Sequence, residues 1–85
     1  GIRVNTICVG MFKSRQHTRR FEAKKAEDSS YTLDDHWAML SKGVPLGRVG
    51  EAEEAGDVIA FLCSERAGFV TGTAINVDGG AAPVV

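Results

Sequence analysis

The apolar positions of the chain follow two periodicities, which predict two strands and a helix between them. Residues 2–9 are rich in β-branched and apolar side chains and end at Gly10, as is typical of a buried strand in a parallel sheet. From Glu51 to Glu65 the apolar residues recur on one helical face; they are Ala52, Ala55, Val58, Ile59 and Leu62. Thr73 to Val77 predicts a second strand, which a Gly-Gly pair ends.

Two more helices are predicted in the polar middle of the chain. Residues 15–27 combine good helix formers with many charges, which favours a solvated helix that breaks at residues 28–30. Thr32 and Asp35 have the spacing of a capping box, and the apolar residues that follow share one helical face; these are Leu33, Trp37 and Leu40. We expect this helix to stop at a left-handed Gly43, with Pro45 just beyond it.

The order strand, helix pair, helix, strand predicts an α/β fold in which helices connect two parallel strands. Two strands do not form a sheet that is stable alone. The strand at residues 2–9 also has the composition of a strand covered on both faces, while the chain offers too few elements to cover it. Packing therefore predicts that these elements belong to a larger sheet.

Composition and charge narrow the class of protein. The 85 residues make at most one domain, and the hydrophobic fraction of 44% is usual for a globular chain. The net charge of −1 favours neither nucleic acid nor an anionic membrane as a partner, and no apolar run approaches the roughly 20 residues of a spanning helix. No secretory pattern is present. Cys8 and Cys63 lack metal or redox spacing, so we expect two buried free thiols in a cytoplasmic protein rather than a disulfide.

The second half of the chain carries two motifs in a fixed order. Residues 45–54 read Pro-Leu-Gly-Arg-Val-Gly-Glu-Ala-Glu-Glu, and residues 71–80 read Thr-Gly-Thr-Ala-Ile-Asn-Val-Asp-Gly-Gly. They resemble the C-terminal end of the short-chain dehydrogenase/reductase family, which typically has Pro-x-Gly-Arg-x-Gly-x-x-Glu-Glu, a helix, and then Thr-Gly-x-x-x-x-Val-Asp-Gly-Gly. Residues 1–5 resemble the strand after that family's catalytic helix. The resemblance covers residues 1–14 and 44–80 and is weak across 15–43.

This resemblance implies the C-terminal portion of a Rossmann-type doubly wound parallel sheet, with its last two strands, lid helices and final crossover helix. It divides one domain into a strand (1–10), a substrate lid (11–43), a final helix and strand (44–80) and a tail (81–85). In the family the last helix and strand commonly form subunit contacts. A homodimer or homotetramer through the Glu51 to Glu65 helix and the Thr73 to Val77 strand is therefore implied.

The loop after the first strand is the candidate cofactor site. The family carries Pro-Gly-x-x-x-Thr there, and its backbone and hydroxyl contact the nicotinamide and phosphate part of the cofactor. Val9 replaces the proline, Gly10 matches the glycine and Ser14 matches the threonine, with Met11 and Phe12 between them. The implied cofactor is NAD or NADP, without distinction. The alternative is that Gly10 only ends a strand and Ser14 only caps a helix.

The implied lid supplies candidate substrate contacts, namely Phe12, His17, Tyr31 and Trp37. Packing of the lid on the body explains Phe12, Tyr31 and Trp37 equally well. Its basic side chains either meet an anionic substrate or form a solvated face with Glu22 and Glu27; they are Arg15, Arg19, Arg20, Lys24 and Lys25. Lids of this kind close over a cofactor and exclude water. No metal is expected, because the candidate ligands lack the spacing of a metal site; they are His17, His36, Asp34 and Asp35.

The function implied by the resemblance is hydride transfer between a nicotinamide and a small-molecule carbonyl or secondary alcohol. The family uses a tyrosine as general acid and base, with a lysine and a serine. Tyr31 is followed four residues later by Asp35 rather than lysine, so it does not supply that pair. We therefore expect these 85 residues to be inactive alone, as the C-terminal segment of an oxidoreductase. The alternative is a non-catalytic truncated relative that acts as a subunit-interaction module.

Overall fold

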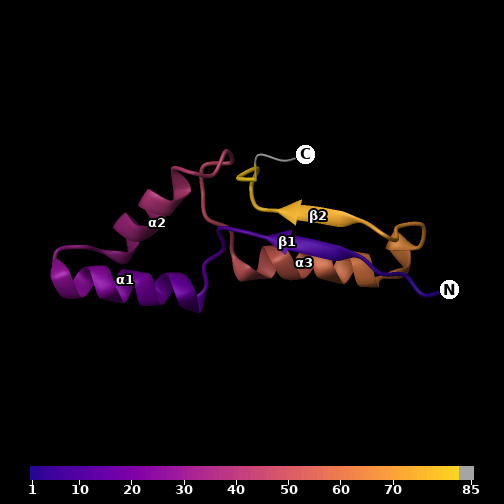
Figure 1. The fold of residues 1–85 in the computed structure, drawn as a ribbon, viewed down its shortest axis with the longest axis horizontal. Coiled ribbons are helices and arrows are strands. Elements are labelled where there is room, and N and C mark those ends of the chain that lie inside the picture. Colours follow the sequence, from indigo (N-terminus) through magenta and orange to yellow (C-terminus); the bar gives the residue numbers. More distant parts are fainter. Residues whose placement is uncertain (83–85) are drawn as a thin grey trace.

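Two parallel strands form the sheet of the protein. In the computed structural model, which describes residues 1–82, β1 (Thr6–Val9) pairs with β2 (Ala74–Val77), with Thr6 opposite Ala74 and Val9 opposite Val77 (Figure 1). The connection between them consists entirely of helices and loops. The predicted α/β class and parallel pairing are confirmed, whereas part of the predicted tail at 81–85 lies outside the described residues.

The three predicted helices are all present. They are α1 (Arg15–Glu27), α2 (Leu33–Ser41) and α3 (Ala52–Cys63). The capping box of α2 is confirmed, since Thr32 Oγ1 accepts from the Asp35 amide and the Asp35 carboxylate accepts from the Thr32 amide. Helix α3 is shorter than predicted because its regular helix ends before Ser64, and a 3₁₀ turn follows at Glu65–Ala67.

Several expectations from the sequence are wrong in detail. The first strand begins at Thr6 rather than at residue 2, because the main-chain groups of Val4 bond the Gly72 amide and the Thr71 hydroxyl in the α3–β2 connection instead of a neighbouring strand. Gly43 does not adopt a left-handed conformation, which occurs instead at Gly47, where φ is 82°. The two cysteines are free as expected, but both are exposed rather than buried.

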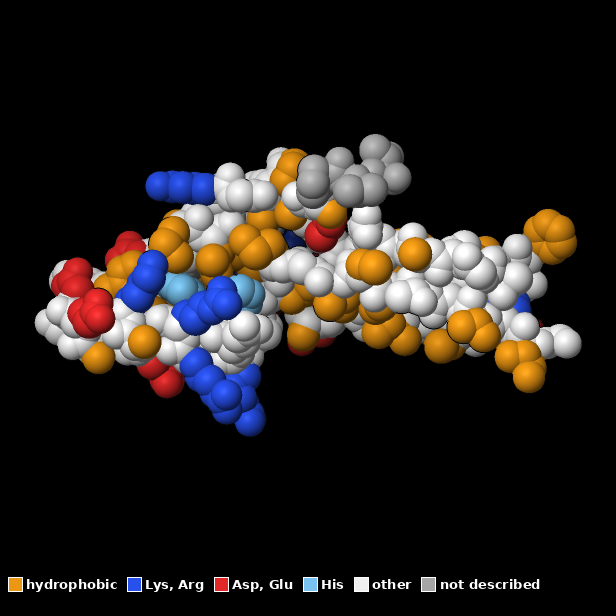
Figure 2. Space-filling view, in the orientation of Figure 1, with side chains coloured by type: hydrophobic (Ala, Val, Ile, Leu, Met, Phe, Trp, Pro, Cys, Tyr) orange, Lys and Arg blue, Asp and Glu red, His pale blue; other side chains and the backbone are white. Residues whose placement is uncertain are grey.

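The protein is elongated, with the α1–α2 helix pair at one end and the strands and α3 at the other (Figure 1). Its radius of gyration is 16.0 Å, whereas a compact chain of this length has about 12 Å. The hydrophobic side chains buried among the described residues are only Val44, Val49, Leu62 and Ala67. Apolar side chains of the strand half reach the surface in Figure 2, and Ile2 and Val9 of the predicted buried strand are 92% and 58% exposed. The elements of this half therefore leave apolar faces uncovered.

Within residues 1–82, no helix combines the length and hydropathy that crossing a bilayer demands.

Candidate functional site

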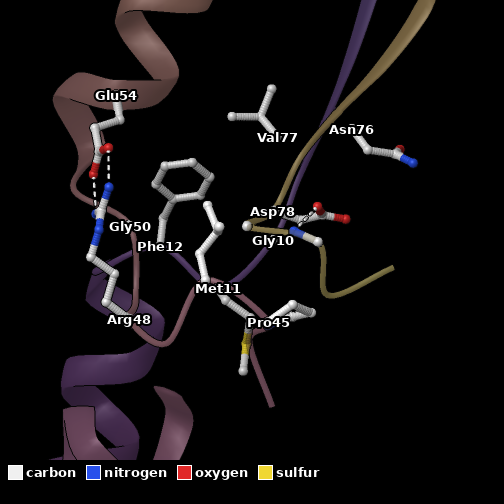
Figure 3. A pocket seen from close by; sticks show the side chains of 13 residues that line it. Gly10, Met11, Phe12, Pro45, Arg48, Gly50, Glu54, Asn76, Val77 and Asp78 are labelled. Carbon is white, nitrogen blue, oxygen red and sulfur yellow. Dashed lines mark hydrogen bonds and ion pairs between the residues drawn. The ribbon is translucent and has the colours of Figure 1, made fainter. Parts of the chain in front are cut away.

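A cavity of about 490 Å³ lies where both strands end. It is lined by the loop after β1, by the segment before α3, and by the end of β2 with its glycine turn (Figure 3). The carboxyl ends of parallel strands are where open α/β sheets bind their ligands. The cavity is therefore the candidate functional site.

The loop after β1 forms one wall and is held by main-chain bonds to Gly50. The Lys13 amide donates to the Gly50 carbonyl at 2.9 Å, and the Gly50 amide donates to the Met11 carbonyl at 2.9 Å. The Phe12 ring lies so close to Gly50 that an added Cβ there would be 2.7 Å from it. Met11 has a φ of 58°, a left-handed conformation that is uncommon for a residue with a side chain. Phe12 and Met11 of this loop both line the cavity (Figure 3).

A charged pair forms the opposite wall. Arg48 donates to both carboxylate oxygens of Glu54, at 2.6 and 2.7 Å (Figure 3). The Glu51 amide also donates to Glu54, at 2.9 Å. Hydrogen bonding from Arg48, followed by that from the Glu51 amide, lowers the pKa of Glu54 to about 2. The same pairing raises the pKa of Arg48. The pair fixes the start of α3 beside the cavity. Two parallel hydrogen bonds between a guanidinium and a carboxylate are a strong and directional arrangement.

We expect the Glu54 carboxyl to titrate near pH 2 and to shift upward, toward its ordinary 4.5, in Arg48→Met. Part of the depression should persist, because the Glu51 amide still donates to the carboxylate. A carboxyl whose folded pKa is depressed stabilises the fold above its unfolded pKa, and this contribution is lost as the pH falls from 4.5 toward 2. The measurement is a carboxyl-carbon NMR titration. Glu53→Gln, one residue away, is the control and should leave the Glu54 midpoint unchanged; an unshifted midpoint in Arg48→Met would contradict the assignment.

The turn after β2 closes the remaining side. Gly79 and Gly80 have φ of 63° and 90°, and Asp78 accepts from the Gly80 and Ala82 amides at 2.9 and 3.0 Å. This confirms the turn expected from the glycine pair. The Gly79 carbonyl also accepts from the Leu46 amide at 3.1 Å, so the turn is joined to the segment that leads into α3.

The predicted cofactor residues divide into two groups. Gly10, Met11 and Phe12 line the cavity, whereas Val9 and Ser14 lie outside its lining. Ser14 occupies the N-cap position of α1 without a side-chain capping bond, so the capping role considered for its hydroxyl is absent. Gly10 has no positive φ, and a Cβ there would make an ordinary contact with Asp78 at 3.6 Å.

The residues present suit a nicotinamide. Apolar side chains of Met11, Phe12 and Val77 offer contacts for a flat ring. Among the described residues, the amide N–H groups of Met11 and Phe12 have no hydrogen-bond partner, so they are available to a carboxamide or phosphate oxygen. The Ser14 hydroxyl is exposed as well. A nicotinamide cofactor supplies a hydride acceptor or donor, and this loop has the groups to hold one.

The predicted lid residues also divide. His17, Tyr31 and Trp37 lie together between α1 and α2, with His36 among them. Phe12 lies in the cavity instead and makes no ring contact with this group among the described residues.

The basic residues of α1 form no ion pair with Glu22 or Glu27 within the described part of the chain, so the paired face considered from the sequence is not present. No group of three or more candidate metal ligands occurs within residues 1–82.

Sequence reasoning missed the wall contributed by the segment before α3. Pro45, Leu46, Arg48 and Gly50 were recognised as a family motif, with no role in a site. The sequence did contain a signal for this wall, namely the family motif itself. The motif places a glycine and two residues of opposite charge at defined positions just before the helix that leads to the second strand. Only the bridge from Phe12 to Gly50, 38 residues apart, shows why they line the cavity.

A protein family and several known proteins are similar in sequence to this chain. The profile of a family described as enoyl-(acyl carrier protein) reductase matches residues 1–82. The chain is 34% identical over 84 residues to an uncharacterized oxidoreductase of Thermotoga maritima. This match covers 99% of this chain and 31% of that protein. It is 36% identical over 81 residues to the 3-oxoacyl-[acyl-carrier-protein] reductase FabG of Haemophilus influenzae, covering 94% of this chain and 28% of the relative. The chain thus spans about a third of the length of these relatives.

A solved structure is similar to this chain in fold. The NADPH-bound structure of a short-chain oxidoreductase from Pseudomonas aeruginosa PAO1, which contains an atypical catalytic center, superposes with a TM-score of 0.80 at 38% identity. The match covers all of this chain and 31% of that one. Similarity at this level extends from the strands to the helix pair.

Proposed function

The chain belongs to the short-chain dehydrogenase/reductase family, and from this premise we propose that it is the C-terminal segment of an NAD(P)-dependent oxidoreductase. The reaction is hydride transfer between the nicotinamide and a carbonyl or secondary alcohol of a small molecule. The observation that carries the proposal is the cavity at the strand ends, where the Met11 and Phe12 amides are available beside apolar side chains. Residues 9–14 then hold the nicotinamide end of the cofactor, and α1 with α2 forms the substrate lid.

The uncovered apolar faces support a longer polypeptide. Val9 of β1 and Ile59 of α3 are 58% and 46% exposed, although the strands of doubly wound sheets are covered on both faces and a crossover helix packs its apolar side against the sheet. Further strands and helices beside β1 and α3 would remove these side chains from water. In this arrangement the catalytic tyrosine, lysine and serine of the family lie in the other part of the polypeptide. Residues 1–85 alone are then inactive, in a protein that we place in the cytoplasm.

A second candidate function rests on other exposed apolar side chains. Phe61 of α3 and Phe69 of the α3–β2 connection are 48% and 106% exposed, so this end of the molecule has apolar surface for a second subunit. A truncated relative that acts only as a subunit-interaction module would bury this surface and bind no cofactor. Cofactor binding therefore separates the two candidates.

Ser14→Ala is expected to weaken NAD(P)H binding about fivefold, since one neutral hydrogen bond contributes about 1 kcal/mol. The Ser14 hydroxyl has no capping role, so the change should leave α1 intact. The measurement is a cofactor titration by nicotinamide fluorescence in the full-length enzyme. Ser29→Ala, in the α1–α2 connection, is the matched control and should bind as the wild type does. Equal affinity in Ser14→Ala and wild type would remove Ser14 from the cofactor site.

The proposal as a whole is tested by the intact mass of the native polypeptide together with carbonyl reduction by NADPH. A mass of roughly three times that of these residues, with turnover, supports the oxidoreductase. A polypeptide of only these 85 residues that forms oligomers and binds neither NADH nor NADPH supports the interaction module and overturns the oxidoreductase.

A further inference from the structure

One histidine forms the centre of the contact between the two lid helices. His36 is 1% exposed and is the one fully buried side chain of α1 and α2. Its ring centroid lies 5.9 Å from those of Phe21 and Tyr31 and 5.4 Å from that of Trp37. Phe21 belongs to α1, Tyr31 to the connection and Trp37 to α2, so His36 joins all three parts of the lid.

The surroundings of His36 favour the neutral ring. Its Nδ1 is hydrogen-bonded to the Tyr31 hydroxyl at 2.9 Å, while its Nε2 is buried without a partner among the described residues. Protonation would add a buried charge to a ring whose Nε2 already lacks a partner among the described residues.

The charges that face His36 also oppose a proton. Burial lowers the pKa of His36, a hydrogen bond with the main chain of His17 raises it, and the charges of Lys24, His17 and Arg20 on α1 lower it further. The nearest carboxylates on α2 are Asp34 and Asp35, and Asp35 is engaged by the Thr32 cap. No ion pair between His36 and a carboxylate exists in the described part of the chain.

The lid is connected to the cavity through Lys13. Its Nζ forms an ion pair with Glu51 at 2.7 Å and lies 5.7 Å from the centre of the Trp37 ring. Lys13 directly follows Phe12, whose ring lines the cavity. The position of Trp37, and thus of α2, is therefore coupled by contact to the wall of the candidate site.

We propose that neutral His36 is the positioning residue of the α1–α2 lid, and that its protonation separates the two helices. The lid role rests on the proposed function, whereas the packing of His36 does not. The sign follows from linkage: the opened lid takes up a proton near the ordinary pKa of about 6.5, and the packed lid does so only at lower pH. Packing is complete above pH 6.5 and is lost as the pH falls below it, with the open fraction rising up to about tenfold per pH unit.

Hydrogen exchange followed by mass spectrometry tests this in the full-length protein between pH 8 and 5, after correction for the intrinsic exchange rate. We expect the amides of α1 and α2 to lose protection severalfold or more below pH 6.5, while those of α3 serve as the internal reference. His36→Gln should abolish the pH dependence, and His17→Gln, which replaces the other histidine of the same contact, should retain it.

Protection of α1 and α2 that stays constant across this range would overturn the proposal, as would a pH dependence that follows His17 rather than His36. If His36→Gln does not fold, the NMR titration of the His36 ring in the wild type decides the matter, and a midpoint at or above 6.5 is the contradicting result. The exchange readout does not depend on turnover, so an inactive protein with a pH-dependent lid contradicts only the oxidoreductase proposal. An active enzyme with a constant lid contradicts only the role of His36.

Discussion

Arg3→Ala is expected to lower the free energy of unfolding of the intact enzyme proposed above by roughly 2–4 kcal/mol. The guanidinium donates to four main-chain carbonyls at the end of α3 and in the connection to β2. These are Leu62 at 3.0 Å, Ser64 at 3.2 Å, Ala67 at 2.8 Å and Val70 at 3.3 Å. The last carbonyls of a helix have no partner within the helix, and a cation at that end also interacts favourably with the helix dipole. Removing the side chain leaves part-buried carbonyls without a donor.

Urea unfolding followed by circular dichroism measures the effect, with Arg66→Ala as the matched control. Arg66 lies in the same connection and is exposed, without an ion pair among the described residues, so its removal should cost less than about 0.5 kcal/mol. Arg3→Lys should recover only part of the loss, because one ammonium group does not reproduce a planar fork that reaches four acceptors. Equal stability of the Arg3→Ala and Arg66→Ala variants would contradict the role assigned to Arg3.

Features set by neighbouring residues were predictable from the sequence. The capping box of Thr32 and Asp35 joins groups three residues apart, and the Asp78 turn joins groups two to four residues apart. The capping box was predicted and is present, and the turn lies where the glycine pair was expected to end the second strand. The helix starts and the parallel pairing followed from periodicity and element order in the same way, because each depends on a short stretch of chain or on the sequence of elements alone.

Features set by distant contacts were not predictable. Arg3 was noted only as part of a family strand, yet its acceptors lie 59 to 67 residues away. His36 was weighed only as a metal ligand, because its burial depends on how α1 folds against α2. In the site, Gly10, Met11 and Phe12 were predicted from the loop that carries them, while Arg48 and Gly50 gained a place in it through the bridge to Phe12. Such placement is a property of the packed chain rather than of any local pattern.

Gly79→Ala is expected to cost roughly 2–4 kcal/mol of stability and to disturb the wall of the cavity. The position has a φ of 63°, which a residue with a side chain adopts at a cost of about 1 kcal/mol or more. The added Cβ would also lie 2.6 Å from Val44 Cγ1, and Val44 is only 5% exposed, so it has little room to move. Displacing it should shift the segment before α3, because the Leu46 amide is bonded to the Gly79 carbonyl.

Two other glycines separate the causes of this effect in thermal and urea unfolding. Gly47 has a φ of 82° with nothing within 4 Å of an added Cβ, so Gly47→Ala should show only the backbone cost. Gly56 lies inside α3 with open space around it, so Gly56→Ala should stabilise the protein by roughly 0.5–1 kcal/mol. If Gly79→Ala costs no more than Gly47→Ala, the contact with Val44 contributes nothing and the turn does not brace the cavity. The other outcome is that Gly79→Ala costs more than Gly47→Ala and that Val44→Ala reduces the penalty of Gly79→Ala. In that case the packing of this turn against Val44 holds the strand ends and the segment before α3 around the candidate site.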